Sequence, residues 1–407
     1  MAKPIIRFKG YQDDWEQRKL GELAEIVGGG TPSTSVDSYW DGDIDWYAPA
    51  EIGEQIYLKS SQRKITEEGL NKSSAKVLPV GTVLFTSRAG IGKTAILLKE
   101  GCTNQGFQSI VPNKDKLDSY FIFTRSEELK RYGEIVGAGS TFVEVSGKQM
   151  ANMELMMPTT MDEQQKIGGY FSNLDNLITL HQRKCDETKR LKKYMLQKMF
   201  PQNGEKVPEI RFSGFTDDWE QRKLGDVAPL RGGYAFKSSE YKKDGTPIVR
   251  ISNILPDGSI GADFACYDDM ENDENISLRN GDALLAMSGA TTGKVSILKC
   301  KNTDKYYQNQ RVGYFKRNIQ YNYDFVSTIV RSDLFKEQLM SVLVAGAQPN
   351  VSSKEIDSFE FVFPLNIEEQ KKIGQYFANL DTLITLHQRE LENLQNIKKF
   401  MLGKMFV

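Results

Sequence analysis

The sequence predicts an α+β protein in which two mixed α/β domains are joined by two long antiparallel coiled-coil helices, with a pseudo-two-fold internal repeat. Two observations lead to this architecture. Residues 6–21 return almost unchanged as residues 210–225. Residues 163–183 return as residues 369–389, and in both copies the apolar residues follow heptad spacing. Each half of the chain therefore contains a short signature, a middle region and a long helix.

The order of these parts sets the expected domain bounds. Residues 1–158 hold the first signature and the first mixed domain, and residues 159–204 hold the first long helix with a linker. Residues 205–364 hold the repeated signature and the second mixed domain, and residues 365–407 hold the second long helix. A chain of 407 residues is also longer than one hydrophobic core usually supports.

The signature and helix are nearly the same in the two halves, but the middle regions, residues 22–157 and 226–363, have diverged heavily. One interpretation is an old duplication that drifted where changes were harmless. The other is one scaffold that presents two different specificities, which must differ where two targets differ. We favour the second interpretation because it predicts a constant frame around variable middles.

Each long helix begins after a proline, Pro158 or Pro364, and continues for roughly 38 residues, which corresponds to about 57 Å. A helix of this length needs a partner, and the other copy is the obvious one. Antiparallel packing would relate the halves by a pseudo-two-fold axis. Lys192 and Lys398 fall at matching positions of the heptad seam, where polar residues can fix the register. The seam residues expected at the helix contact are Ile167, Phe171, Leu174, Ile178 and His181 in the first copy, and Ile373, Phe377, Leu380, Ile384 and His387 in the second.

His181 and His387 are the only histidines of the chain and occupy equivalent seam positions. A catalytic or metal-binding role is one interpretation. Helix–helix packing explains them without any further residue, so we interpret both as structural.

Composition excludes several classes of protein. The net charge of −1 argues mildly against a simple nucleic-acid binder, which is usually basic. No long uncharged apolar run or signal peptide is apparent, so we expect no membrane association. The four cysteines are scattered without a CxxC pair, which fits a reducing cytoplasm better than a disulfide framework or a zinc site.

The diverged middles read as short strands and turns with a few helices. Residues 82–86 and 94–98 are expected to be strands around a glycine-rich turn, and so are residues 283–287 and 295–298. Helices are expected within residues 120–132 and 323–342.

The turn at residues 90–94, Gly-Ile-Gly-Lys-Thr, invites a phosphate-loop interpretation, but Ser87 stands where the motif requires glycine. The second copy, from Thr292 to Val295, also lacks the hydroxyl that follows the lysine. A glycine-rich hairpin whose amides and lysine approach a DNA phosphate remains. The basic candidates for DNA binding are Arg88, Lys93, Lys294 and Arg311, each of which could equally be a solvated surface charge.

Amide side chains recur at similar places, as Asn104-Gln105 and Asn309-Gln310. Asn and Gln can read adenine in the major groove, although they also stabilise turns. The glycine-bearing loops before each helix add Ser140, Thr141 and Gln348 as candidate DNA contacts. No methyltransferase, dinucleotide, zinc-protease or nuclease motif is apparent, so we expect no catalytic residues and no metal ligands.

Taken together, the repeated motifs resemble the DNA specificity subunits of Type I restriction-modification systems. The resemblance rests on Trp15–Gly21 with its repeat Trp219–Gly225, and on the helix Glu163–Arg183 with its repeat Glu369–Arg389. It covers essentially the whole chain.

The resemblance implies a specificity subunit with two target recognition domains, each of which reads one half of a bipartite, asymmetric site in double-stranded DNA. It implies that the helices set the unread spacer and dock two methylase subunits, which restriction/translocase subunits join. S-adenosylmethionine, ATP and Mg would then be bound by these partner subunits, and no cofactor by this chain. The alternatives are a stand-alone methyltransferase or nuclease, and a duplicated protein-binding scaffold without DNA affinity.

Overall fold

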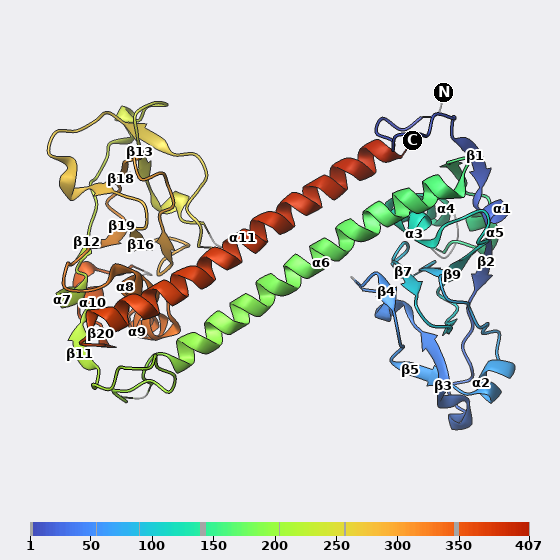
Figure 1. Ribbon diagram of the computed structural model, residues 1–407, viewed down its shortest axis with the longest axis horizontal. Helices are drawn as coiled ribbons and strands as arrows, with labels where there is room; N and C mark the ends of the chain where they lie inside the picture. Colours follow the sequence, from blue (N-terminus) through green and yellow to red (C-terminus); the bar gives the residue numbers. More distant parts are fainter. Residues whose placement is uncertain are drawn as a thin grey trace. The chain divides into compact units, whose positions relative to one another are not determined.

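The computed structural model describes residues 3–53, 55–88, 90–138, 144–202, 204–255, 258–345 and 350–406 (Figure 1). The chain forms two compact units. The first unit consists of residues 1–182 and 389–407, and the second consists of residues 183–388. Each unit thus contains one mixed α/β domain and segments of both long helices. The domain ranges expected from the sequence differ from these units, because they divide the chain into consecutive segments and treat each long helix as a separate part.

The first unit begins with a strand of the signature and contains three sheets. The two-stranded sheet pairs β1 with β10, the five-stranded sheet has the order β2-β9-β6-β7-β4, and the three-stranded sheet has the order β5-β3-β8. The strands are β1 (Glu16–Lys19), β2 (Ala24–Gly28), β3 (Trp40–Tyr47), β4 (Tyr57–Leu58), β5 (Arg63–Ile65), β6 (Val83–Phe85), β7 (Thr94–Leu97), β8 (Cys102–Thr103), β9 (Gln108–Pro112) and β10 (Glu154–Met157). The helices are α1 (Leu20–Leu23), α2 (Glu67–Asn71), α3 (Ser119–Thr124), α4 (Ser126–Gly137) and α5 (Gly147–Ala151), with 3-10 turns at Asp37–Tyr39 and Pro49–Glu51.

The second unit repeats this plan, with two four-stranded sheets in place of the five- and three-stranded ones. Its sheets have the orders β11-β20, β12-β19-β16-β17 and β14-β13-β18-β15. The strands are β11 (Glu220–Lys223), β12 (Leu230–Arg231), β13 (Thr246–Val249), β14 (Ala265–Tyr267), β15 (Ser277–Leu278), β16 (Ala283–Ala286), β17 (Val295–Ile297), β18 (Tyr306–Gln308), β19 (Val312–Phe315) and β20 (Glu360–Phe363). The helices are α7 (Leu224–Val227), α8 (Tyr323–Ile329), α9 (Asp333–Ala345) and α10 (Ser353–Asp357), with 3-10 turns at Ser238–Glu240, Ile251–Asn253 and Asp273–Asn275.

The expected hairpins are confirmed as β6–β7 and β16–β17, and the expected helical segments as α3–α4 and α8–α9. Matching side chains cap equivalent helices in the two units. The Asp118 carboxylate accepts a hydrogen bond from the Phe121 backbone amide at 2.8 Å. The side-chain carbonyl of Asn322 accepts one from the Phe325 backbone amide at 2.9 Å. The same local chemistry therefore starts α3 and α8, although the sequences around them differ.

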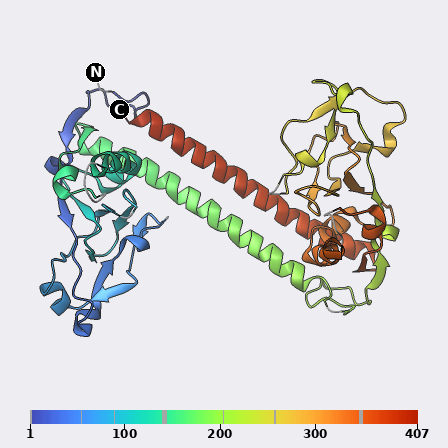
Figure 2. The same ribbon diagram turned by 180° about the vertical axis from the view of Figure 1, so that it is seen from behind.

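The long helices are α6 (Met161–Lys198) and α11 (Ile367–Met405). Within each unit they run side by side in opposite directions (Figures 1 and 2). In the first unit the Phe171 and Phe406 rings lie 6.0 Å apart between centroids. In the second unit the Phe377 and Phe200 rings lie 5.9 Å apart. Because α6 begins where α11 ends, and the reverse, the expected antiparallel pairing is confirmed in each unit.

The seam residues near the start of each helix do more than contact the other helix. Ile167, Phe171 and Leu174 are buried in a core with Trp15 and Phe121 of the first unit. Their repeats Ile373, Phe377 and Leu380 belong to the corresponding core of the second unit. The seam positions further along, Ile178, His181, Ile384 and His387, are half-buried. The heptad pattern therefore covers packing of the helix against its domain as well as against its partner helix.

No helix within the described ranges is both long and apolar enough to cross a bilayer.

Candidate nucleic-acid interface

The repeated signature holds each domain on its long helix. The Arg7 guanidinium donates to both carboxylate oxygens of Glu163 at 2.6 and 2.8 Å, and Glu163 is almost fully buried. Arg211 and Glu369 make the same bidentate pair at the same two distances. Because an unpaired buried charge is costly, these residues explain why the signature and the helix start recur together. These four residues hold each domain on its long helix, a role that was not predicted from the sequence.

The first candidate site is a meeting point of three loops in the first unit, here called the first junction. It comprises the β6–β7 hairpin turn, the β8–β9 loop at residues 104–107, and residues 144–145 before α5. The Ser87 amide donates to the Gly106 carbonyl at 2.8 Å, and the Val145 amide donates to the Ser87 carbonyl at 3.0 Å. Backbone hydrogen bonds thus tie the three loops to one another.

The second unit repeats this arrangement as the second junction, formed by the β16–β17 turn, residues 309–311 and residues 350–351. The Met287 amide donates to the Arg311 carbonyl, and the Val351 amide donates to the Met287 carbonyl, both at 3.0 Å. The Asn104 amide donates to the Tyr47 carbonyl, as the Asn309 amide does to Val249. Because the bonds match one for one, the two junctions can be compared residue by residue.

The structure brings the described DNA-binding candidates of each half together at its junction. The first junction carries Arg88, Lys93, Asn104 and Gln105, and the second carries Lys294, Asn309, Gln310 and Arg311. Ser140, Thr141 and Gln348 lie outside the described residues. The hairpin and the amide pair are separate in the sequence, and their meeting at one junction could not be predicted from either motif alone.

Individual side chains at the first junction differ in their freedom to meet a ligand. The Asn104 side-chain carbonyl accepts a hydrogen bond from the Gly106 amide at 2.8 Å, which favours the turn-stabilising interpretation of Asn104. Gln105 and Lys93 are exposed. The Arg88 guanidinium lies 4.0 Å from the Glu144 carboxylate, with both side chains 37% exposed.

The two junctions present different side chains from equivalent positions. The matched bonds place Gly106 opposite Arg311 and Arg88 opposite Ser288. A Cβ atom at Gly106 would lie 3.7 Å from Nε of Arg88, so the arginine of the first junction extends over this glycine. Each junction therefore carries one arginine at these two matched positions, on the hairpin in the first and on the strand loop in the second.

Each junction also depends on a glycine that packs closely against the backbone, and this role of the glycine was not predicted from the sequence. A Cβ atom at Gly29 would lie 1.9 Å from the Asn104 carbonyl oxygen, and one at Gly233 would lie 2.3 Å from the Asn309 carbonyl oxygen. Only glycine permits this approach. The glycine runs at residues 28–30 and 232–233 were the available signal.

Two carboxylates link the long helices to the domains, Asp175, which is buried, and Asp381, which is half-buried, and we call the clusters around them the first and second lock. In the first lock, Asp175 accepts hydrogen bonds from the Lys398 ammonium at 2.6 Å and from the Tyr120 hydroxyl at 2.8 Å. In the second lock, Asp381 accepts from Lys192 and, at 2.6 Å, from Arg331. The polar seam lysines noted in the sequence thus have carboxylate partners.

Charge balance differs between the locks. Burial opposes ionisation of Asp381, but Arg331 and Lys192 outweigh it and lower the pKa of this carboxyl below its ordinary value. Burial, followed by the positive charge of Arg331, lowers the pKa of Lys192. In the first lock, burial and the Asp175 charge raise the pKa of the Tyr120 phenol, which keeps its hydroxyl proton as a donor.

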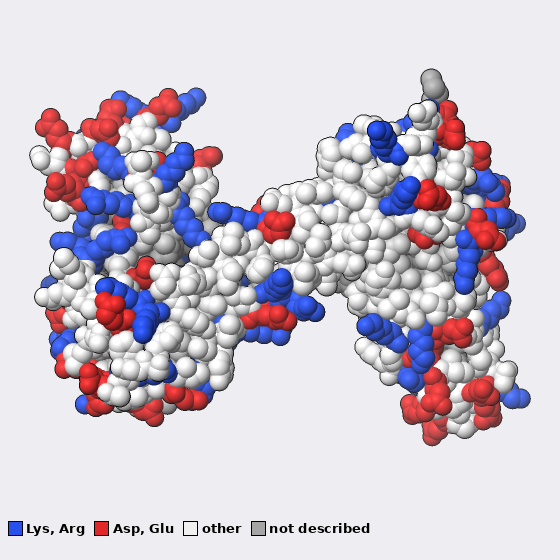
Figure 3. Space-filling model, in the orientation of Figure 1, with Lys and Arg blue, Asp and Glu red and all other residues white. Residues whose placement is uncertain are grey.

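Charges over the surface are mixed. Figure 3 shows Lys and Arg interspersed with Asp and Glu on both units. A groove of about 1020 Å³ in the second unit has basic and acidic side chains, including Arg231, Arg317 and Asp282. Among the described residues, no group of three or more His, Cys, Asp or Glu side chains is placed to hold a metal ion.

A constant frame around two equivalent junctions with different side chains defines a duplicated recognition protein. Comparison with known proteins specifies its class. The family model of the Type I restriction modification DNA specificity domain matches residues 12–190 and again residues 216–396. The chain therefore belongs to this family and carries two of its domains. The family is defined by DNA specificity and not by catalysis, so the chain is a specificity subunit and not an enzyme.

Individual relatives agree with this assignment. The chain is 31% identical over 261 residues to the Type I restriction enzyme MjaIX specificity subunit of Methanocaldococcus jannaschii, a match that spans 60% of this chain and 58% of that protein. It is 24% identical to the MjaVIII specificity subunit of the same organism, over 95% of this chain and 91% of the relative. The crystal structure of a Type I restriction-modification S subunit from M. genitalium has the same fold, with a TM-score of 0.69 at 14% identity over 100% of this chain and 99% of that one.

Proposed function

We propose that each unit reads one half of a bipartite, asymmetric site in double-stranded DNA, and that the two junctions are the reading surfaces. The long helices would set the unread gap between the two halves. The chain itself would perform no chemistry and bind no cofactor.

The observation that carries this proposal is the exchange of chemistry between equivalent junction positions. Loops that merely drifted would be expected to lose their geometry together with their sequence. Here the backbone hydrogen bonds are kept, while Gly106 is replaced by Arg311 and Arg88 by Ser288. A guanidinium that donates two hydrogen bonds to guanine is the commonest specific contact in the major groove. Moving it from one loop to another changes which base it can reach.

Exposed apolar side chains at equivalent positions of the two units support docking of two methylase subunits, one on each unit. They lie on the long helices, and large exposed apolar side chains are frequent at interaction surfaces. They are Leu177, Ile397 and Phe400 in the first unit, and their repeats Leu383, Leu191 and Tyr194 in the second. Methylase subunits docked there would supply S-adenosylmethionine, and restriction/translocase subunits would supply the ATP- and Mg-dependent steps. Basic residues of these partners would complement the mixed charge of this chain.

The test compares matched arginine variants, Arg88→Gln and Arg311→Gln, in cells that co-express the chain with a methylase subunit of the same organism. Sequencing that detects methylated adenine gives the recognised motif directly. We expect the wild-type chain to give two short halves around a fixed gap. Each variant should relax one position in one half only, with a loss of about 1–3 kcal/mol of discrimination there.

Lys114→Gln and Lys316→Gln are matched controls, because these exposed lysines follow β9 and β19, at the strand ends away from the junctions. They should leave both halves unchanged. A uniform loss of binding with a salt dependence reduced by about one ion would assign the arginines to phosphates and not to bases. A continuous methylated motif, or the same half altered by both variants, would contradict the proposal.

A further inference from the structure

In both locks one carboxylate oxygen binds a lysine of the other long helix, and the second oxygen binds a donor of the recognition domain. Oδ1 of Asp175 binds the lysine of α11, and Oδ2 binds Tyr120 of α3. Oδ1 of Asp381 binds the lysine of α6, and Oδ2 binds Arg331, which precedes α9. One carboxylate therefore joins three elements in each unit: both long helices and the recognition domain.

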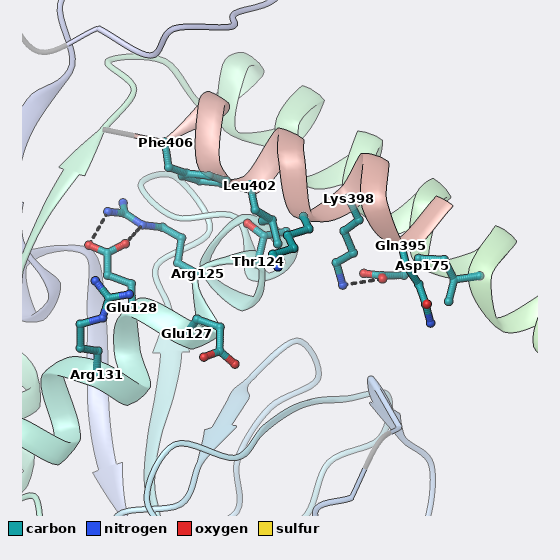
Figure 4. Close-up of a pocket in the computed structure, with 12 residues that line it drawn as sticks. Thr124, Arg125, Glu127, Glu128, Arg131, Asp175, Gln395, Lys398, Leu402 and Phe406 are labelled. Carbon is teal, nitrogen blue, oxygen red and sulfur yellow. Dashed lines mark hydrogen bonds and ion pairs between the residues drawn. The ribbon is translucent and has the colours of Figure 1, made fainter. Parts of the chain in front are cut away.

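A hydrophobic core joins these elements in the first unit, but the packing between them is not continuous. A pocket of about 730 Å³, open to solvent, lies between the α3–α4 region and the helix pair (Figure 4). Asp175 and Lys398 meet at one end of this pocket, and Phe406 and Arg125 lie at the other (Figure 4). Close-packed side chains specify one arrangement because they leave no room for others, and along this pocket that constraint is weaker. The polar contacts at its edge therefore add a constraint to that of the apolar core.

The locks also oppose sliding of the helices. Each long helix contributes one aspartate and one lysine: α6 contributes Asp175 and Lys192, and α11 contributes Asp381 and Lys398. A slide of one helix along the other therefore breaks both locks together. A slide of one turn moves the contact by about 5.4 Å, which exceeds the rise of about 3.4 Å per base pair of DNA.

We propose that Asp175 and Asp381 are positioning residues for DNA recognition, which fix the orientation of each reading domain on the helix pair and so the width of the unread gap. This inference rests on the proposed function. According to this inference, the width of the unread gap depends on these two side chains as well as on the length of the helices. Either lock alone is sufficient to hold the register, because both resist the same slide.

The test is the gap distribution in the methylated motif for Asp175→Asn, Asp381→Asn and the double variant. Asparagine keeps the shape but loses the charge and turns one acceptor into a donor. Each single variant should keep one gap width. The double variant should methylate sites with two or more gap widths, while both half-sites stay unchanged. Glu187→Gln is the control, because its pair with Arg183 is exposed and lies within α6 alone.

A rescue variant covers the case in which the double variant does not fold. It combines Asp381→Asn with the exchanged pair Asp175→Lys and Lys398→Asp, which rebuilds one lock with reversed charges. It should restore a single gap of wild-type width. A double variant that folds and keeps one gap width overturns the proposal, and so does a rescue variant that fails to restore the wild-type gap. A wild-type chain without a bipartite motif would instead refute the proposed function.

Discussion

Replacing Glu369 with leucine should destabilise the second unit selectively. The substitution leaves the Arg211 guanidinium without its carboxylate, and removal of one partner from a buried ion pair costs about 3–5 kcal/mol. Arg211 retains 11% side-chain exposure and a 2.8 Å bond to the Asp217 carbonyl, so we expect the lower end, about 3 kcal/mol. At about 2–4 °C per kcal/mol for a unit of this size, the melting temperature should fall by about 6–12 °C.

Urea denaturation combined with hydrogen exchange measures this effect, because exchange reports which unit opens. Glu163→Leu should produce the same loss in the first unit. The double variant Arg211→Leu with Glu369→Leu should recover most of the stability, since two apolar side chains can replace a buried pair. Glu368→Leu is the control, because that side chain is 61% exposed. A loss below about 1 kcal/mol for Glu369→Leu, or opening of the first unit, would refute the reasoning.

Three further outcomes are expected. The pKa of Asp381 is lowered in the folded state, so the ionised carboxylate stabilises the fold fully above the ordinary aspartate pKa of about 3.9, and this stabilisation is lost as the pH falls below that value. Urea titrations should show that the free energy of unfolding depends less on acidic pH in Asp381→Asn than in the wild type. Gly233→Ala should weaken DNA binding and cost about 1–3 kcal/mol, whereas Gly232→Ala, whose Cβ would meet nothing within 4 Å, should be neutral in both assays. Burial raises the pKa of the Cys102 thiol to about 11, so mass spectrometry after alkylation at pH 8 should find this cysteine unmodified until the chain unfolds.

The repeat and the heptad spacing were sufficient to predict the duplicated architecture, because both depend on residues close together in the sequence. The two hairpins were predictable for the same reason. The parallel pairing of β3 with β8 and of β13 with β18 joins strands far apart in the chain, and no local pattern reports it. Gly29 and Gly233 stand in the sequence, but their role could not be predicted from it. The carbonyl oxygens that leave no room for a Cβ atom at these positions belong to loops far along the chain.

The candidate residues were predictable in type but not in arrangement. Asn104 looked suited to base recognition, yet its side chain closes a turn. Lys192 and Lys398 were recognised as polar seam positions, while the aspartates they bind were overlooked within the repeated Asn-Leu-Asp motif. A repeated carboxylate facing a repeated lysine on an antiparallel partner was the signal that could have identified the locks.

The end of α11 belongs to the first unit and the end of α6 to the second, and this arrangement has a consequence for synthesis of the chain. Phe406 packs against Trp15 and Phe121, so the core of the first recognition domain contains a residue that the ribosome adds only after the whole second domain. The second domain has no such delay, because Phe200 is made before its partner Trp219. A nascent chain would therefore complete its C-terminal domain no later than its N-terminal one. Premature termination that removes the end of α11 would leave the earliest-made domain with an open core, which marks the unfinished product for proteolysis.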